Sequence, residues 1–531
     1  MKSEQKRALI LDAVRERGGL LPGVATAVAK ETGVPEAEVY GAASFFHLLA
    51  DPNTRVRVCT GLSCRIAGAD DVLDRARQSG MPVEPVSCLA ACDRPCAVLR
   101  DRETLAAVTT ADIDAAAGDW TALTSGAGEG WLGEIGPAGV PDQELAMNLA
   151  ARPSYEGAAW TRALGLGDDA VLDAIEESGL QGRGGAGFPA HIKWRGVRGQ
   201  AAQPHYVVLN ADEGEPGTFK DRELLMRRPD LVIEGLAIAA RVLGARDIYL
   251  YLRGEFGGPW RALESAIGEY ASRGLFDGLS FHLHAGHGAY ICGEEMAMLE
   301  ALEGKRGMPR LKPPFPTEVG LWGKPTLIQN VETIACVPAI VSRGGAWFKA
   351  LGRTGAGTKL YSISGHVVRP GNYELPLGVC LDELVEAAGG YLGELYAFSP
   401  GGASSGFLPA GERKRPLDFV ALAEAGSMLG SAGVVVLNRT IDIAWAVREQ
   451  LRFFEVESCG QCAPCRIGTR FLREAMDQYC DQPDASGRVH LQQVADVAWE
   501  MNEGSICGLG QAAALPLTTA MKYFGKEFSD A

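Results

Sequence analysis

Four cysteines near the C-terminal end have the spacing of iron–sulfur ligands: Cys459, Cys462, Cys465 and Cys507. The first three form a C-x2-C-x2-C loop in the segment ESCGQCAPCR, and the fourth stands well beyond it. This pattern favours a [4Fe–4S] cluster, because four thiolates must converge on the cluster from several directions. A helix beginning near Arg466 would direct backbone N–H groups at the anionic cluster. Chance spacing and structural zinc are the alternatives, although zinc sites usually pair two doublets.

A second group of cysteines lies near the N-terminal end: Cys59, Cys64, Cys88 and Cys92. They form a C-x4-C and a C-x3-C doublet, each of which follows a predicted strand. Two doublets can hold the two irons of a [2Fe–2S] cluster, with one pair of thiolates for each iron. Zinc, or free thiols in a vestigial domain, are the alternatives. Cys96 adds a further thiol nearby.

A glycine-rich loop, GRGGAGFP at residues 182–189, formally matches the G-x-G-x-x-G pattern of dinucleotide-binding folds. Its context differs from that pattern, because a helical stretch precedes the loop and Pro189 interrupts the helix that should follow. We therefore interpret it as a loop whose glycines let the backbone approach a flat cofactor, with Arg183 and Lys193 supplying positive charge. A Rossmann phosphate loop is the alternative.

Three polar corners could bind the hydroxyl groups of a nucleotide. The segment NADEGEPGT at residues 210–218 packs three carboxylates into four residues after an apolar strand. The segments YICGEE at 290–295 and QNVET at 329–333 add two similar corners. Carboxylates can accept hydrogen bonds from ribityl and ribose hydroxyls and from the nicotinamide amide, and they repel the extra phosphate of NADP. A solvated acidic turn and a metal site are the alternatives.

The composition excludes several classes of function. The formal charge of −15 and the lack of a long basic run argue against a nucleic-acid or anionic-membrane surface. The most apolar segment, residues 231–243, contains Glu234 and Arg241 and is too short to span a bilayer. The first residues do not form a signal peptide, so we expect a cytoplasmic protein without direct membrane insertion. Thirteen cysteines in such a chain favour metal or redox chemistry over disulfides.

Alternating and periodic apolar residues predict the elements that position these groups. Short helices are expected over 1–50, then strands at 55–58, 83–87 and 97–99 with a helix over 69–78. Residues 119–150 are rich in Gly, Ala and Pro and are interpreted as a linker. A large α/β unit, a small strand-rich insert and a helical C-terminal part follow. The length also favours several domains.

These segments together resemble the flavoprotein subunit of complex I and its relatives in NAD-linked hydrogenases and formate dehydrogenases. The matching stretches also include Glu303–Gly307, Pro309–Pro316 and Pro325–Thr333. The resemblance implies an α/β multidomain fold: a helical lead (1–50), a thioredoxin-like [2Fe–2S] domain (51–118), a linker (119–150), a Rossmann-like but non-classical FMN and NADH domain (151–345), a β-grasp domain (346–435) and a helical bundle with the [4Fe–4S] cluster (436–531).

The resemblance also implies roles for individual residues. FMN contacts are expected at Gly182, Arg183, Gly184, Gly185, Gly187, Lys193, Asn210, Asp212, Glu213, Tyr290, Gly293, Glu294, Asn330 and Thr333. Residues expected beside the dinucleotide are Glu215 and Glu295, the candidate catalytic residues, together with Lys312 and Phe315, whose ring could stack on it.

The fused front domain, which keeps four cysteines, looks most like the β subunit of soluble NAD-dependent formate dehydrogenases. This implies hydride exchange between NAD and FMN, single-electron transfer to the clusters, and a large catalytic subunit containing molybdenum or tungsten and iron–sulfur clusters. A diaphorase subunit of an NAD-reducing hydrogenase, a complex I flavoprotein module that reduces quinone, and a non-enzymatic iron–sulfur scaffold are the alternatives.

Overall fold

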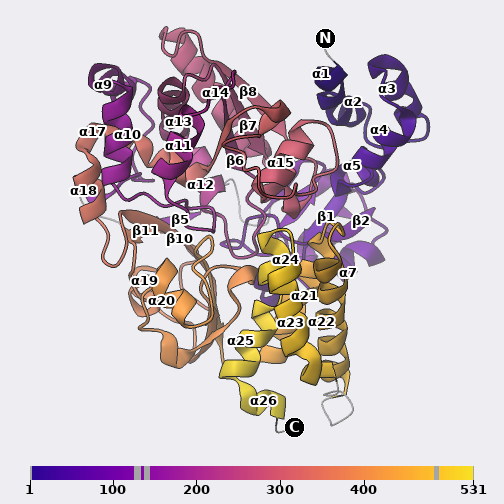
Figure 1. The fold of residues 1–531 in the computed structure, drawn as a ribbon. Helices are drawn as coiled ribbons and strands as arrows, with labels where there is room; N and C mark the ends of the chain where they lie inside the picture. The colour runs from indigo at the N-terminus through magenta and orange to yellow at the C-terminus, as the bar shows by residue number, and fades with distance from the viewer. Residues whose placement is uncertain (1–2, 125–132, 137–143, 483–489, 530–531) are drawn as a thin grey trace.

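The computed structural model describes residues 3–124, 133–136, 144–482 and 490–529. These residues form an α/β multidomain protein with three sheets and a C-terminal helical bundle (Figure 1). The N-terminal helices and the parallel sheet lie at one end of the molecule, and the bundle lies at the other. Among the described helices, none combines the length and the apolar character that crossing a membrane requires.

A cluster of short helices begins the chain, as the sequence predicts. They are α1 (Ser3–Ala8), α2 (Ile10–Glu16), α3 (Val24–Thr32), α4 (Glu36–Ala43) and α5 (His47–Ala50). Val14 and Val28 are fully buried in the core that these helices share. The N–H of Leu48 donates to the carbonyl oxygen of His287 at 3.0 Å, so the cluster is fastened to the parallel-sheet domain.

The front domain has a mixed sheet of order β2-β1-β3-β4, in which β1 is parallel to β2 and antiparallel to β3. Its elements are β1 (Val56–Cys59), α6 (Leu62–Ile66), α7 (Ala69–Gln78), β2 (Val83–Val86), β3 (Val98–Arg100), β4 (Glu103–Leu105) and α8 (Thr110–Ala116). The predicted helix over 69–78 has the observed bounds. Its apolar face, including Val72 and Leu73, packs on the sheet because these residues recur at helical spacing.

The largest unit is built on a parallel sheet of order β8-β7-β6-β9. Its strands are β6 (Tyr206–Ala211), β7 (Asp247–Leu252), β8 (Ser280–Ala285) and β9 (Thr326–Asn330). Its helices are α9 (Ala158–Leu166), α10 (Asp168–Glu177), α11 (Ala190–Arg198), α12 (Lys220–Arg227), α13 (Pro229–Leu243), α14 (Gly257–Ser272), α15 (Glu295–Leu302), α16 (Val331–Ala335), α17 (Val337–Arg343) and α18 (Gly345–Ala350). Val207 and Leu209 enter one core and Val208 enters another, so both faces of the sheet are covered, as is usual for parallel strands.

The strand order changes direction beside β6. The chain moves outward through β7 and β8 and then returns to place β9 on the other side of β6. In open parallel sheets, such a switch point leaves a crevice at the carboxyl ends of the strands, and ligands bind there. The fold therefore indicates a cofactor site at the carboxyl ends of β6 and its neighbouring strands.

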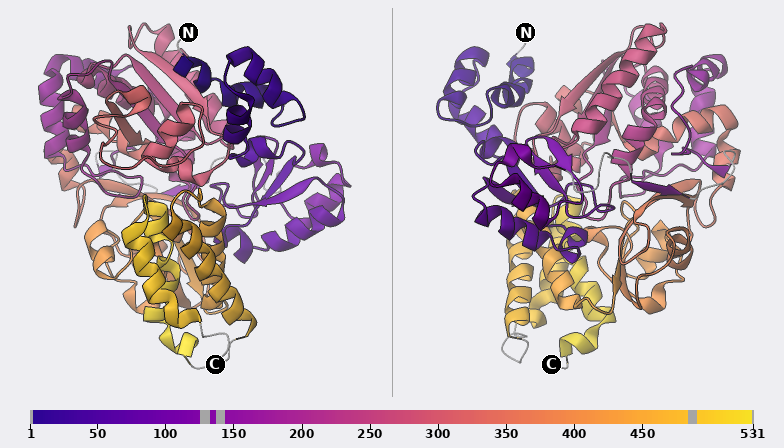
Figure 2. Two further views of the ribbon diagram at one scale, coloured as in Figure 1. Left: turned by 45° about the vertical axis from the view of Figure 1, so that its right-hand side comes forward. Right: turned by 180° about the vertical axis from the view of Figure 1, so that it is seen from behind.

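The third sheet has the order β13-β12-β14-β10-β11-β5. The orange part of the chain, which carries most of this sheet, lies beside the yellow bundle (Figure 2). Its elements are β5 (Glu134–Gly136), β10 (Thr358–Gly365), β11 (Gly371–Pro376), α19 (Leu381–Ala387), β12 (Leu395–Ser399), β13 (Leu408–Pro409), α20 (Phe419–Glu424) and β14 (Gly433–Asn438). The segment interpreted as a linker thus contributes an edge strand, because β5 pairs in parallel with β11. Residues 125–132 and 137–143 of that segment lie outside the described residues.

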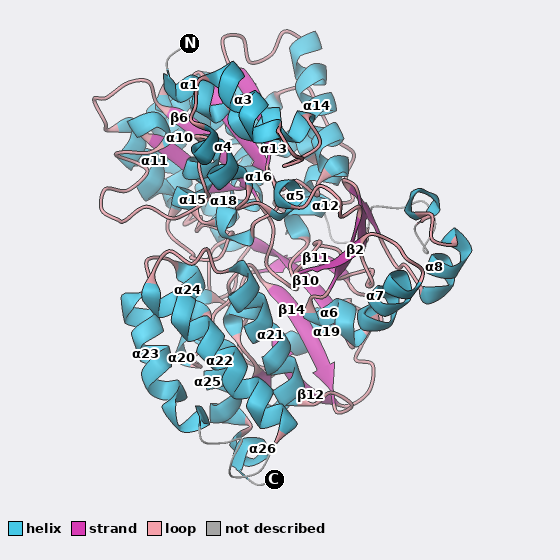
Figure 3. Ribbon diagram, turned by 90° about the vertical axis from the view of Figure 1, so that its right-hand side faces the viewer, coloured by secondary structure: helices cyan, strands magenta, loops and turns pink. Residues whose placement is uncertain are grey.

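The C-terminal part forms a helical bundle (Figure 3). Its helices are α21 (Ile443–Glu457), α22 (Ala463–Asp481), α23 (Val494–Gly504), α24 (Gly508–Ala512), α25 (Leu515–Tyr523) and α26 (Gly525–Ser529). Leu451, Leu472 and Leu517 are buried in their common core. The loop between α21 and α22 lies at the end of the bundle that faces the parallel-sheet domain.

Candidate active site

Three of the predicted segments converge at the switch point of the parallel sheet. Asn210 and Asn330 pair in register near the carboxyl ends of β6 and β9. The glycine loop reaches the same place, because the N–H of Arg183 donates to Oγ1 of Thr333 at 2.9 Å. A side chain on Gly184 would bring its Cβ to 3.1 Å from Cβ of Asn330, so glycine permits this close approach.

Two buried polar side chains near this crevice have atoms without a hydrogen-bond partner among the described residues. The side chain of Arg183 is fully buried, and Nη2 donates to the carbonyl oxygen of Ala356 at 2.7 Å while Nε and Nη1 have no acceptor. Oδ2 of Asp212 is likewise buried without a donor, and burial raises the pKa of this carboxyl well above its usual range. Leaving such a group unpaired costs about 1–3 kcal/mol, so both point to a missing ligand.

The two unpaired groups fit the chemistry of a flavin mononucleotide. A guanidinium is suited to a phosphate group, because its planar N–H donors match the phosphate oxygens. A buried carboxyl is suited to a hydroxyl group such as those of a ribityl chain. Arg183 would then hold the phosphate group, and Asp212 a hydroxyl group of the ribityl chain.

Other predicted flavin contacts are occupied by bonds within the protein. The carboxylate of Glu213 accepts the backbone N–H groups of Asp221 at 2.7 Å and Arg222 at 2.9 Å, at the start of α12. Burial raises the pKa of Glu213 to about 7. Nδ2 of Asn210 donates to the carbonyl oxygen of Gly293 at 2.8 Å. These side chains hold the loops together, and direct flavin contact by them stays a prediction.

Charged residues form a network on α15 and the loop after it. Nζ of Lys193 lies 2.7 Å from Glu295, and Nζ of Lys312 lies 2.8 Å from both Glu294 and Glu295. Although burial opposes ionisation, these lysines lower the pKa of Glu295 to about 2. Glu294 also accepts two backbone N–H groups at the start of α15. Phe315, three residues after Lys312, is 51% exposed, and its stacking on the dinucleotide stays a prediction.

Glu215 lies at a different corner from Glu295. The hydroxyl group of Tyr290 donates to one oxygen of Glu215, and the N–H of Ser404 donates to the other at 2.7 Å. Burial raises the pKa of Glu215 above its usual range. The predicted candidates Glu215 and Glu295 therefore sit in neutral and in strongly cationic surroundings, respectively.

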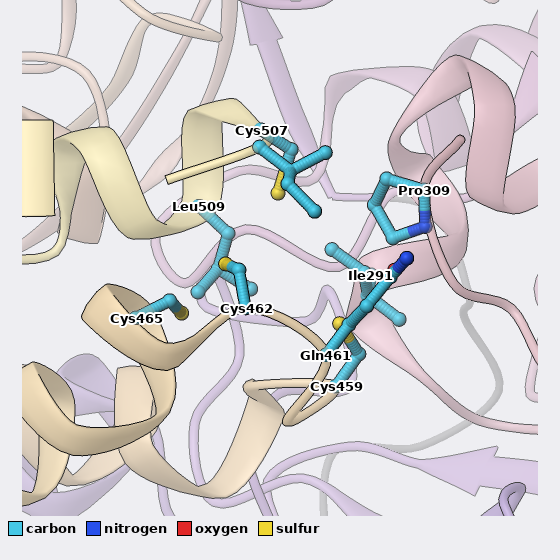
Figure 4. Close-up of a pocket in the computed structure, with 9 residues that line it drawn as sticks. Ile291, Pro309, Cys459, Gln461, Cys462, Cys465, Cys507 and Leu509 are labelled. Carbon is cyan, nitrogen blue, oxygen red and sulfur yellow. The ribbon is translucent and has the colours of Figure 1, made fainter. Parts of the chain in front are cut away.

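The C-terminal cysteines surround one small pocket (Figure 4). Cys459 lies on the loop after α21, Cys462 is the N-cap of α22, Cys465 lies in its first turn, and Cys507 is the N-cap of α24. The N-terminus of α22, which begins three residues before the predicted position, therefore points at the pocket. Its partial positive charge favours an anionic cluster held by these four thiolates.

The N-terminal cysteines are buried and adjacent to one another. The thiol of Cys59 lies within hydrogen-bond distance of those of Cys64 and Cys88, and the thiol of Cys88 lies near that of Cys92. Cys96 instead donates to the carbonyl oxygen of Ala67. In the described part of the chain, no three His, Cys, Asp or Glu side chains converge on a single metal ion. A cluster is larger than an ion, because irons and sulfides stand between its thiolates.

Comparisons with known proteins agree with this geometry. Family models match at residues 2–120 (Thioredoxin-like [2Fe-2S] ferredoxin), 175–339 (Nuo51 FMN-binding domain), 360–408 (SLBB domain) and 445–531 (NADH-ubiquinone oxidoreductase-F iron-sulfur binding region). The F subunit of an NADH-quinone oxidoreductase of Rhizobium meliloti (the one numbered 2) is 46% identical over 73% of this chain and 94% of its own length. The chain belongs to the flavoprotein family of complex I, the F subunits of NADH-quinone oxidoreductases.

Further relatives extend the comparison. The F subunit of the NADH-quinone oxidoreductase of Mycobacterium tuberculosis is 43% identical over 70% of this chain and 86% of its own length. A crystal structure of an NAD+-reducing [NiFe]-hydrogenase in the H2-reduced state contains a chain with a TM-score of 0.88. That chain is 33% identical, and the match covers 98% of this chain and 92% of that one.

Family membership confirms several predictions made from the sequence. The α/β multidomain fold has the expected thioredoxin-like domain, FMN domain and helical C-terminal part. The family models confirm FMN, [4Fe–4S] and [2Fe–2S] as cofactors. This member of the complex I flavoprotein family is therefore an NAD-dependent flavin and iron–sulfur oxidoreductase. The roles of individual side chains stay predictions.

The residues that join the front domain to the rest of this family member were not predicted from the sequence. Arg222 donates to the carbonyl oxygen of Ala90 at 2.6 Å and pairs with Asp93 at 2.9 Å. Glu457 accepts the hydroxyl group of Ser87 at 2.6 Å and the N–H of Tyr290 at 3.0 Å. These pairs are far apart in the chain, so spacing could not reveal them. The sequence does contain a signal that could have identified Arg253 as a candidate, because this charged residue directly follows an apolar strand.

We expect Glu295→Gln to raise the KM for NADH about tenfold with FMN retained. A hydrogen bond to a charged group contributes about 1.5–3 kcal/mol, and the amide would release Lys193 and Lys312 from their pairing. Because the pKa of Glu295 is depressed, its carboxylate stays ionised between roughly pH 8 and pH 5 and adds no pH dependence there. Steady-state NADH–ferricyanide kinetics and flavin content test this.

The matched control is Glu300→Gln on the same helix, since Glu300 pairs with Lys305 and Arg310 instead. We expect the control to leave the KM close to that of the unmodified protein. Unchanged NADH kinetics in Glu295→Gln would remove Glu295 from the dinucleotide site.

Proposed function

We propose that this chain is the NAD-reactive electron-transfer subunit of an NAD-dependent formate dehydrogenase. Its partner would be a large catalytic subunit that contains molybdenum or tungsten and iron–sulfur clusters. The observation that carries the proposal is the front domain, whose four buried, adjacent cysteines share one chain with the flavin crevice and the C-terminal cysteines. The curated relatives cover about three quarters of the chain, whereas a formate dehydrogenase β subunit is expected to carry the additional front domain.

In this reaction, the residues of the chain bind and orient FMN and the dinucleotide. FMN, when bound, exchanges a hydride with NAD and single electrons with the clusters. Arg183 would hold its phosphate group and Asp212 a ribityl hydroxyl group, and the lysine-paired Glu295 would receive the dinucleotide beside Phe315. Bulky side chains at Gly184 would block the approach of the backbone to the crevice. None of these residues needs to act as an acid or a base, since hydride transfer requires no protein proton.

A second candidate is a subunit of an NAD-reducing hydrogenase. It is supported by the structural match to the hydrogenase chain, which extends over 98% of this chain and so includes the front domain. The sequence similarity to the NADH-quinone oxidoreductase subunits supports a quinone-linked module, but this similarity extends over a smaller share of the chain.

The test is to purify the native complex anaerobically through a tag on this chain and to assay NAD+ reduction with formate, and separately with hydrogen. We expect formate-dependent activity and a copurifying subunit with stoichiometric molybdenum or tungsten. Hydrogen-dependent activity with a nickel-containing subunit would replace the proposal with the second candidate. Activity with neither donor, but with NADH and a quinone, would assign the chain to a quinone-linked complex.

A further inference from the structure

Arg253 lies where the flavin crevice meets the front-cluster cysteines. It directly follows β7, at the same carboxyl edge of the parallel sheet as the acidic loop. Its buried guanidinium donates from Nη1 to the carbonyl oxygen of Glu213 at 2.6 Å and from Nη2 to the carbonyl oxygen of Cys88 at 2.7 Å. One side chain thus joins the backbone of the flavin loop to the backbone of a predicted cluster ligand.

The charge of Arg253 is balanced by one carboxylate. Nε and Nη2 lie 3.2 and 3.1 Å from the two oxygens of Glu255, whose side chain is 1% exposed. Although burial opposes ionisation, Arg253 keeps the pKa of Glu255 below its usual range. Nε2 of His47 also lies 3.6 Å from Oε1 of Glu255. Arg253 and Glu255 therefore form a buried ion pair whose guanidinium also bonds to the backbone of Cys88.

Other charged groups near this point have their own arrangements. Asp212, Glu457, His47, Arg253 and Glu255 line one small cavity with Cys88. Arg222 approaches the same cysteine loop but is paired with Asp93 and Glu223. Among these groups, Arg253 is the cation that bonds directly to a residue of the cysteine set.

We propose that Arg253 is a positioning residue that holds the front [2Fe–2S] site against the flavin loop and raises the reduction potential of that cluster. Reduction adds one negative charge to the cluster, and a fixed cation in a buried, low-dielectric region favours the more negative form. Glu255 limits this effect, because it neutralises part of the positive charge. The inference depends on the front cluster and holds equally for a formate, hydrogen or quinone-linked complex.

Paired substitutions test the charge and the bonds separately. Arg253→Gln should lower the ratio of reduced to oxidised [2Fe–2S] cluster at a fixed potential by about tenfold, which corresponds to about 59 mV for one electron. Glu255→Gln should move the ratio in the opposite direction, since it leaves the cation unbalanced. The double substitution should lie between the two, and Arg253→Lys should stay close to the unmodified protein. Potentiometric titration of the purified complex, followed by electron paramagnetic resonance, measures each ratio.

The [4Fe–4S] signal in the same samples is the internal control, and its ratio should not change. Arg195→Gln, which removes an exposed arginine paired with Asp173 and Glu176, is the matched charge control. Shifts of the same sign in Arg253→Gln and Glu255→Gln, or no shift in either with the cluster retained, would overturn the proposal. If Arg253→Gln loses the cluster, Glu255→Gln still decides the sign of the effect.

Discussion

Replacing Cys507 with alanine should abolish the [4Fe–4S] signal and all electron transfer to the partner subunit, while NADH oxidation by ferricyanide continues. Cys507 reaches the pocket from a separate helix and completes the set that Cys459, Cys462 and Cys465 begin (Figure 4). Three thiolates from one loop leave one corner of the cluster without its ligand. The flavin crevice lies in another domain, so its reaction with NADH and an artificial acceptor is retained.

Cys480→Ala is the matched control for this prediction. Cys480 lies on α22 as well, but roughly 20 Å along the helix from Cys465 at a rise of about 1.5 Å per residue. The control should keep the full [4Fe–4S] signal and the full partner-linked activity. An unchanged [4Fe–4S] signal in Cys507→Ala would show that a different residue completes the set.

Arg183→Ala should cause the largest loss of flavin. The variant removes two donor atoms, Nε and Nη1, that have no acceptor among the described residues, and each charge-assisted hydrogen bond to a bound phosphate group would contribute about 1.5–3 kcal/mol. Two such bonds correspond to about 3–6 kcal/mol, so we expect the affinity for FMN to fall by about 100-fold or more and the purified variant to be largely free of flavin. Arg183→Lys should recover part of the affinity, because a point charge replaces the planar fork.

Fluorescence titration of the flavin-free protein with FMN measures both affinities. Riboflavin, which lacks the phosphate group, is the ligand control and should bind Arg183→Ala and the unmodified protein equally weakly. Arg195→Ala, an exposed arginine on α11, should bind FMN normally. An FMN affinity that is unchanged in Arg183→Ala would move the phosphate site elsewhere.

Local spacing predicted much of the structure. The helix at Ala69–Gln78 has the predicted bounds, since glycines flank its apolar repeat on both sides. The C-x2-C-x2-C loop was sufficient to predict the pocket of Figure 4, because three of the four cysteines that line the pocket lie in this one loop. The preference for a non-classical loop over a Rossmann phosphate loop also agrees with the structure, in which the helix α10, and not a strand, precedes the glycine loop.

Long-range pairing accounts for most of what the sequence did not reveal. Residues 134–136 form β5 only because β11 offers an edge more than 200 residues later, so the segment itself resembles a linker. The bonds of Arg253 to Glu213 and Cys88 likewise join elements from different domains. For Glu213, the resemblance predicts a flavin contact. In the structure, the carboxylate of Glu213 accepts two backbone N–H groups of α12.

We expect this single chain to oxidise NADH at its flavin and to pass the electrons from the flavin to two iron–sulfur clusters. An anaerobic titration of the purified protein with NADH, followed by optical and electron paramagnetic resonance spectra, tests this connection. We predict that NADH bleaches the flavin absorbance. The electron paramagnetic resonance spectra should then show one reduced [4Fe–4S] cluster and one reduced [2Fe–2S] cluster in the same chain. A protein that binds no FMN, or whose clusters stay oxidised when NADH has reduced the flavin, would contradict it.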